Sequence, residues 1–199
     1  MKDYSMTNSE DRIAWIDTET NGLSPRDGSR LLQVALIITD GDLNELNDGL
    51  EVKIHYSEQE LQDLYEAADP FVKDMHEKTG LWSACAVEGI DLSSASSLLV
   101  DELQHYISTS RTAELAGNSI TLDRNFLEAE LPEVLEYLNY RSYDMSSVAK
   151  YLQLNAQHLP SFEKKRNHDA LGDIRESIAE ARYYSEFLRR LVSNNRWNF

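Results

Sequence analysis

The 199-residue sequence has little of several features that mark particular classes of protein. Its single cysteine, Cys85, excludes an internal disulfide and a cysteine-based zinc site. Eight glycines and four prolines are too few for a disordered or repeat-built chain. No apolar run approaches the roughly 18 residues of a membrane span, and residues 1–11 lack the apolar segment of a signal peptide. We therefore expect a folded cytoplasmic protein with no membrane partner.

Basic residues are also scarce. Nineteen Lys and Arg stand against 35 Asp and Glu, which gives a formal net charge of -16 at pH 7. Affinity for long polynucleotides comes mostly from Lys and Arg side chains that neutralise many phosphates. The partner is therefore either not nucleic acid or a very short one. A di- or trinucleotide has so few phosphates that metal ions and a few local donors could hold it, which is a hypothesis at this point.

Apolar periodicity predicts one domain over residues 1–199, with residues 1–11 as a flexible N-terminal segment. Strands are predicted over 12–20, 31–39, 49–56, 113–118 and 141–144. Helices are predicted over 57–68, 69–80, from Ser93 or Ser94 to 107, over 121–131, from Ser146 to about 152, and over 169–192. An opening three-stranded meander followed by alternating helices and strands indicates an α/β fold with a mixed central sheet flanked by helices.

Two acidic residues stand at the end of the first predicted strand. Asp17 and Glu19 point to the same face because side chains alternate along a strand. Two carboxylates held together repel each other unless a cation lies between them, so the pair indicates a site for a hard metal ion. The alternative is a solvated strand end that carries two acids.

Three more residues could complete such a site. Asp123 follows a predicted Gly-Asn-Ser turn, and Asp173 lies five residues after His168 near the start of the last helix. Each has an ordinary alternative. Asp123 could be a first-turn acid favoured by the helix dipole, Asp173 an exposed helix residue, and His168 a loop or capping residue.

Taken in order, these residues resemble the three motifs of the DEDD exonuclease superfamily, in the branch with a histidine base. The matching stretches are residues 15–23 (WIDTETNGL), 117–123 (GNSITLD) and 168–177 (HDALGDIRES). With Tyr140 and Arg141, they are most similar to the oligoribonuclease family. The resemblance implies a ribonuclease-H-like exonuclease fold. It also implies 3′-to-5′ degradation of di- to about pentaribonucleotides to nucleoside 5′-monophosphates.

The resemblance also implies a mechanism. The carboxylates of Asp17, Glu19, Asp123 and Asp173 would hold two divalent cations, Mg²⁺ or Mn²⁺, which activate water and stabilise the leaving 3′ oxygen. His168 would be the general base, since a free imidazole pKa of about 6.5 suits proton transfer near neutrality.

Substrate-binding positions follow from the same resemblance. Leu23 would pack on a base, Phe71 would stack on another, and His76 and Ser119 would lie near the 3′ end of short single-stranded RNA. Tyr140, Arg141 and Ser146 would cap the 5′ phosphate, and in the family they come from the second subunit of a homodimer. Leu23 could instead pack in its turn, and Tyr140 and Arg141 could be surface residues at a strand edge.

The sequence also departs from the family. Thr20-Asn21 and Thr121-Leu122 differ from the usual residues, and residues 151–154 replace an Arg-Arg-Trp string. Residues 18–20 (TET), with Gly22, are closer to the proofreading exonuclease subunits of DNA polymerase. One alternative function is therefore a proofreading-like 3′-to-5′ exonuclease on single-stranded DNA, with short DNA as its partner. A second is a catalytically silent nucleic-acid-binding module.

Overall fold

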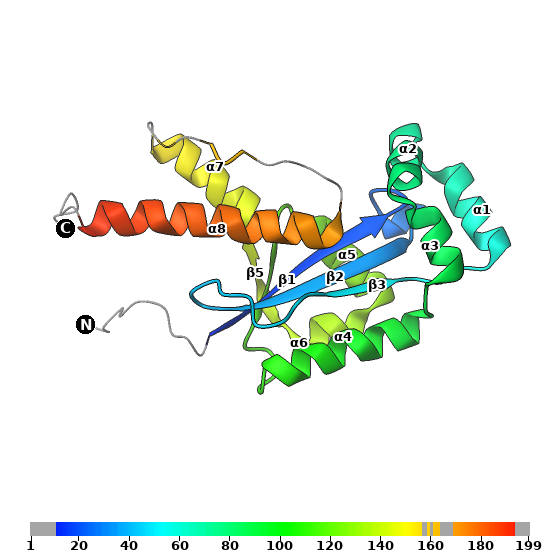
Figure 1. Cartoon of the computed structure of the whole chain (residues 1–199), viewed down its shortest axis with the longest axis horizontal. Helices are drawn as coiled ribbons and strands as arrows, with labels where there is room; N and C mark the ends of the chain where they lie inside the picture. Colours follow the sequence, from blue (N-terminus) through cyan, green and yellow to red (C-terminus); the bar gives the residue numbers. More distant parts are fainter. Residues whose placement is uncertain (1–10, 157–158, 160, 164–168, 194–199) are drawn as a thin grey trace.

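A five-stranded mixed sheet forms the centre of the protein, with helices on both faces (Figure 1). The computed structural model describes residues 11–156, 159, 161–163 and 169–193. The strands are β1 (Arg12–Thr20), β2 (Leu31–Asp40), β3 (Leu50–Lys53), β4 (Glu114–Gly117) and β5 (Asn139–Asp144). The helices are η1 (Pro25–Asp27), α1 (Glu58–Ala67), α2 (Pro70–Thr79), α3 (Leu81–Val87), α4 (Leu92–Tyr106), α5 (Thr121–Glu130), α6 (Pro132–Tyr137), α7 (Met145–Asn155) and α8 (Ala170–Ser193).

The order across the sheet is β3-β2-β1-β4-β5, with antiparallel pairing among the first three strands and parallel pairing of β1 with β4 and β4 with β5. This confirms the predicted meander and the mixed sheet. The third strand is shorter than predicted. The backbone N–H of His55 donates to Ile90, and Ile54 forms an isolated bridge with the same residue, so the regular ladder ends at Lys53.

Alternation along β1 separates two hydrophobic cores, one on each face of the sheet. Ala14 and Ile16 pack in the core covered by α4, α5 and α6, whereas Trp15 packs in the core covered by α7 and α8. Because the odd-numbered residues of β1 face α8, the side chains that follow Trp15 on that face are Asp17 and Glu19. The apolar pattern of β1 therefore directs both acids toward the first turn of α8.

Two predicted helix starts are wrong by a few residues, for one reason. Helix α4 is capped by Asp91, whose carboxylate accepts from the backbone N–H of Ser94, and not by Ser93 or Ser94. Helix α7 is capped by Asp144, which accepts from the backbone N–H of Ser146. An aspartate ahead of the serine reaches the free amides of the first turn and takes the capping position.

Two short helices, α3 and α6, were not predicted, since seven and six residues are too few to establish a helical period. The predicted capping box of Ser57 with Glu60 and the end of α2 at Gly80 are confirmed. Within the described ranges, no helix is both long enough and apolar enough to cross a membrane.

Candidate active site

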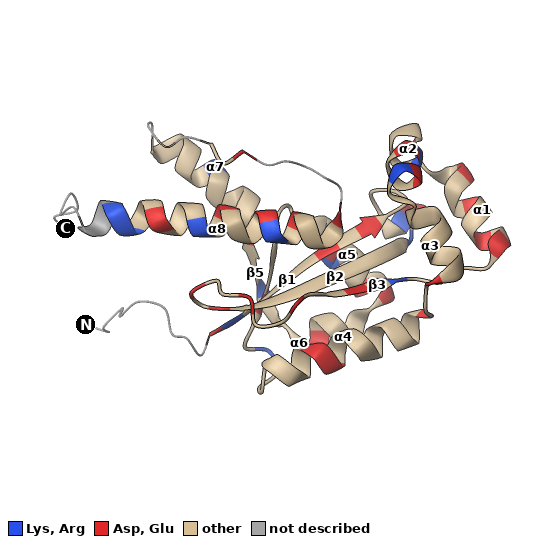
Figure 2. Ribbon diagram, viewed as in Figure 1, with Lys and Arg blue, Asp and Glu red and all other residues tan. Residues whose placement is uncertain are grey.

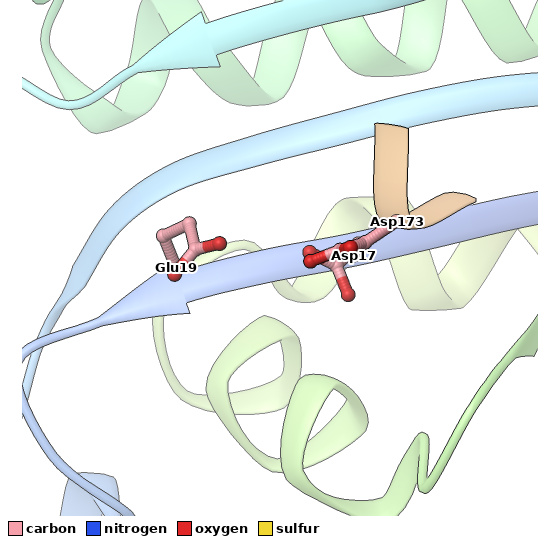
Figure 3. A group of neighbouring side chains, drawn as sticks. All are labelled: Asp17, Glu19 and Asp173. Carbon is pink, nitrogen blue, oxygen red and sulfur yellow. The ribbon is translucent and has the colours of Figure 1, made fainter. Parts of the chain in front are cut away.

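Three carboxylates converge where β1 meets the start of α8. Asp17 and Glu19 extend from β1, and Asp173 reaches them from the first turn of α8 (Figure 3). Each side chain offers an oxygen, and these oxygens all lie within 4.8 Å of one another. The structure therefore brings together three of the four acids predicted from the sequence.

Strand lengths and the start of α8 explain this convergence. The parallel ladder between β1 and β4 covers only Ile13 to Trp15 of β1, so the acidic end of β1 extends beyond its neighbour. Helix α8 begins after Asp169, whose side chain accepts from the backbone N–H of Gly172 and whose carbonyl accepts from that of Asp173. Capping by Asp169 fixes the first turn of α8, and with it Asp173, over β1.

The fourth acid, Asp123, lies on α5 and is attached to β1 through Thr18. Its Oδ1 accepts from the backbone N–H of Thr18 at 2.9 Å and from the Thr18 hydroxyl at 2.7 Å. Its side chain is buried, with 5% of the residue exposed. Burial raises the pKa of Asp123 to about 6, although the hydrogen bonds from Thr18 oppose the shift. Asp123 thus adds charge beside the cluster and does not belong to the group of three converging oxygens.

Burial and neighbouring negative charges both act on the carboxyl group of Glu19. Its burial, followed by the negative charges of Asp173, Asp123 and Asp169, raises the pKa of Glu19 from 4.5 to about 8. A divalent cation among these carboxylates would remove this repulsion, and Mg²⁺ and Mn²⁺ prefer oxygen ligands. The donor set therefore fits a hard divalent metal.

His76 supports the end of β1 from α2. Its Nε2 donates to the carbonyl oxygen of Thr20 at 3.0 Å and lies 3.9 Å from a carboxylate oxygen of Glu19. The ring is almost completely buried, with 1% of the residue exposed. In this arrangement His76 holds the backbone beside Glu19, and its contact with substrate stays a prediction.

His168, the predicted base, lies outside the described residues. Two predicted base-contacting side chains are described and strongly exposed: Leu23 between β1 and η1, and Phe71 in the first turn of α2. Helix α2 lies beside the end of β1 (Figure 1), which places Phe71 on an element next to the carboxylates.

Ser119 and Ser146, predicted for opposite ends of the substrate, contact each other. Their hydroxyl oxygens lie 3.0 Å apart, and Ser146 also donates to Asn118 Oδ1 at 3.0 Å. The Asn118 amide donates to Ser177 Oγ at 2.8 Å, and that hydroxyl donates to the carbonyl of Asp173 at 2.9 Å. Asn118 and Ser177 were not predicted as site residues, although both lie within the quoted motifs.

Comparisons with known proteins agree with this geometry. The chain matches the RNase_T exonuclease family over residues 14–181. It is 37% identical over 181 residues to the oligoribonuclease of Mycobacterium sp. strain KMS, covering 88% of this chain and 80% of that protein. The oligoribonuclease of Nocardia farcinica is 35% identical over 181 residues, with the same coverage.

Solved structures share the fold at low sequence identity. Exonuclease I from Methylocaldum szegediense superposes with a TM-score of 0.65 at 19% identity, covering 91% of this chain. The zinc-bound complex of E. coli exonuclease I with single-stranded DNA gives 0.67 at 15% identity and 92% coverage. This chain spans only 42% of either protein. The likeness confirms the predicted ribonuclease-H-like exonuclease fold.

Proposed function

The chain belongs to the RNase_T exonuclease family and, within it, to the oligoribonucleases, and we propose that it degrades di- to about pentaribonucleotides from their 3′ ends to nucleoside 5′-monophosphates. The observation that carries this proposal is the convergence of Asp17, Glu19 and Asp173 within 4.8 Å. The intact acidic set argues against a silent binding module, because a protein that only binds has no use for carboxylates that repel one another.

Asp17, Glu19, Asp123 and Asp173 would hold two Mg²⁺ or Mn²⁺ ions, with Asp123 contributed by α5. When bound, such ions supply Lewis acidity for water and charge stabilisation for the leaving oxygen. The protein itself holds the carboxylates in place before any metal binds. Thr18 holds Asp123, and the cap at Asp169 holds Asp173. His168 would accept the proton of the attacking water, and Leu23 and Phe71 would pack on the terminal bases.

Surface charge supports a short substrate. Among the described residues, the Lys and Arg positions are scattered along the ribbon among Asp and Glu positions (Figure 2), and over the whole sequence 19 Lys and Arg stand against 35 Asp and Glu. A long strand would need a continuous basic track to neutralise its phosphates, whereas a short one needs few contacts. Arg141, Tyr140 and Ser146 are the proposed contacts for the 5′ phosphate. A cytoplasmic location, expected from the sequence, stays part of the proposal.

We also infer a homodimer. Strand β5 is an edge of the sheet, and Tyr140 on it is 79% exposed. Tyr151 and Leu154, one helical turn apart on α7, are also strongly exposed. Unpaired strand edges and apolar side chains of this kind favour association with a second copy. Analytical sedimentation tests the oligomeric state. A monomer that cleaves dinucleotides with full activity would refute a phosphate cap supplied by the partner.

The test of function compares RNA di- and heptanucleotides with single-stranded DNA, all 5′-labelled and supplied with Mg²⁺ or Mn²⁺. We expect rapid metal-dependent cleavage of the diribonucleotide, which Asp17→Ala abolishes. Rapid cleavage of DNA but not of the dinucleotide would support the proofreading-like alternative. Absence of metal-dependent cleavage on every substrate would support the binding module.

A further inference from the structure

Strand β5 carries two extra residues at the open edge of the sheet. Glu114 of β4 pairs with Asn139, but the next residue, Leu115, pairs with Ser142. Tyr140 and Arg141 therefore have no partners on β4 and form a bulge. Bulges turn side chains away from the regular alternation of a strand. Here the bulge places an aromatic ring and a guanidinium together on the surface, since the Arg141 Cζ lies 5.4 Å from the centre of the Tyr140 ring.

The guanidinium of Arg141 is available for a ligand. Within the described part of the chain it forms no ion pair, although the sequence has 35 acidic residues. The bulge itself is closed by Asn139, whose side chain accepts from the backbone N–H of Arg141 at 2.9 Å. An arginine that is held next to an aromatic ring and faces no carboxylate is suited to a phosphate group.

A second arginine, Arg124, holds this bulge from behind. It follows Asp123 on α5, and its Nη2 lies 3.3 Å from the Ser142 hydroxyl oxygen and 3.5 Å from the carbonyl oxygens of Asn139 and Arg141. A bulge interrupts the regular ladder, and the Nη2 of Arg124 lies near backbone carbonyl oxygens on both sides of Tyr140.

Arg124 has no carboxylate partner among the described residues either, and its Nε is buried without a hydrogen-bond partner there. A guanidinium in so acidic a chain would ordinarily pair with an acid. Its position against the backbone of the bulge therefore indicates a specific role, which is to keep that backbone in one shape.

We propose that Arg124 is a positioning residue for recognition of the 5′-terminal phosphate, acting through the Tyr140–Arg141 bulge. The ligand class is a nucleotide with a terminal phosphate monoester, whose second negative charge distinguishes it from an internal phosphodiester. The inference rests on the proposed function, which assigns the phosphate to Arg141. It adds that α5, which carries Asp123 of one active site, also shapes the phosphate contact that the chain would offer to the substrate of the second subunit.

The test compares diadenylate with a 5′ phosphate (pApA) and with a 5′ hydroxyl (ApA), using kcat/KM for each. Loss of a hydrogen bond to a charged group corresponds to a factor of about ten or more. We expect Arg124→Ala to lower kcat/KM for pApA by at least about tenfold and that for ApA by much less. Arg124→Lys should fall between, because an ammonium keeps the charge but not the planar fork.

Two variants calibrate the result. Arg141→Ala should lower the ratio of pApA to ApA at least as much as Arg124→Ala. Arg189→Ala serves as the matched control, because Arg189 pairs at the surface with Asp42, 3.4 Å away near the far end of α8, and should leave the ratio unchanged.

The outcomes separate the inference from the function it rests on. An equal loss on both substrates in the Arg124→Lys enzyme would overturn the inference and make Arg124 a purely structural residue. A ratio that responds to Arg141→Ala but not to either Arg124 variant would overturn it as well. If wild type and Arg141→Ala cleave pApA and ApA with the same ratio, the phosphate assignment in the proposed function is itself wrong and the inference fails with it.

Discussion

One carboxylate oxygen of Asp123 accepts two hydrogen bonds from Thr18, one from its backbone N–H at 2.9 Å and one from its hydroxyl at 2.7 Å. Thr18 lies between Asp17 and Glu19, and its side chain faces the opposite side of β1. Thr18 therefore links Asp123 of α5 to the part of β1 that carries Asp17 and Glu19. This link fixes α5 to the free edge of β1 beyond the end of the β4 ladder.

Replacing the Thr18 hydroxyl tests this link. Thr18→Val keeps the shape of the side chain but leaves the buried Asp123 oxygen with one donor fewer. We expect the free energy of unfolding to fall by about 1.5–3 kcal/mol, the range for a hydrogen bond to a charged group. Urea denaturation measures it. Thr18→Ser, which restores the hydroxyl, should recover most of the loss, and an equally unstable serine variant would contradict the assigned role of the hydroxyl.

The raised pKa values of Glu19 and Asp123 predict how stability depends on pH without metal. A carboxyl with a raised pKa in the folded state favours its protonated form there. Its contribution to stability is full below the ordinary pKa and is lost as pH rises through the folded-state value. For Glu19 this window runs from 4.5 to about 8, and for Asp123 from 3.8 to about 6. In EDTA, the free energy of unfolding contributed by these groups should therefore decrease as pH rises from 4 to about 8.

Metal should reverse this trend, because it binds the deprotonated carboxylates. Added Mn²⁺ or Mg²⁺ should stabilise the protein strongly at pH 8 and little at pH 5. Urea denaturation at pH 5 and pH 8, each with metal or with EDTA, gives the four free energies of unfolding that the comparison needs. Glu19→Gln should flatten the pH dependence in EDTA and weaken stabilisation by metal. Equal stabilisation by metal at the two pH values would contradict a site built on Glu19.

His168→Ala tests the proposed general base. Because the histidine is not among the proposed metal ligands, we expect turnover to fall by about two to four orders of magnitude while metal affinity stays near that of wild type. Turnover on a dinucleotide and calorimetric titration with Mn²⁺ measure the two effects separately. Unchanged turnover would remove His168 from the mechanism, and a parallel loss of metal affinity would reassign it as a ligand.

Local patterns in the sequence predicted much of the site. Strand alternation alone placed Asp17 and Glu19 on one face, and the helix predicted over residues 169–192 placed Asp173 near its N-terminus. The link from Thr18 to Asp123 could not be predicted, because it depends on the β4 ladder ending before β1 does. Motif resemblance could supply Asp123 as a site residue but not the partner that holds it.

Two other features depend on which of two residues caps a helix and on the pairing register of two strands. Asp144 caps α7 in place of Ser146, since both residues can cap and only the backbone decides between them. The Tyr140–Arg141 bulge exists because the pairing of β4 with β5 changes register. Arg124, which contacts the backbone of the bulge, comes from a different element, α5. Neither feature has a periodic signal in the sequence. Recognition of the substrate therefore remained less predictable than the carboxylate cluster.

The most direct test of the whole account is the release of labelled mononucleotide from a 5′-labelled diribonucleotide by wild type and Asp173→Asn. Asparagine keeps the size of the side chain but removes the charge that the α8 turn brings to Asp17 and Glu19. We predict Mn²⁺-dependent release by wild type and a loss of at least about a hundredfold in the variant, with the fold intact by circular dichroism. Release that is equally fast in the variant, or that persists in EDTA, would contradict metal-dependent hydrolysis at this cluster.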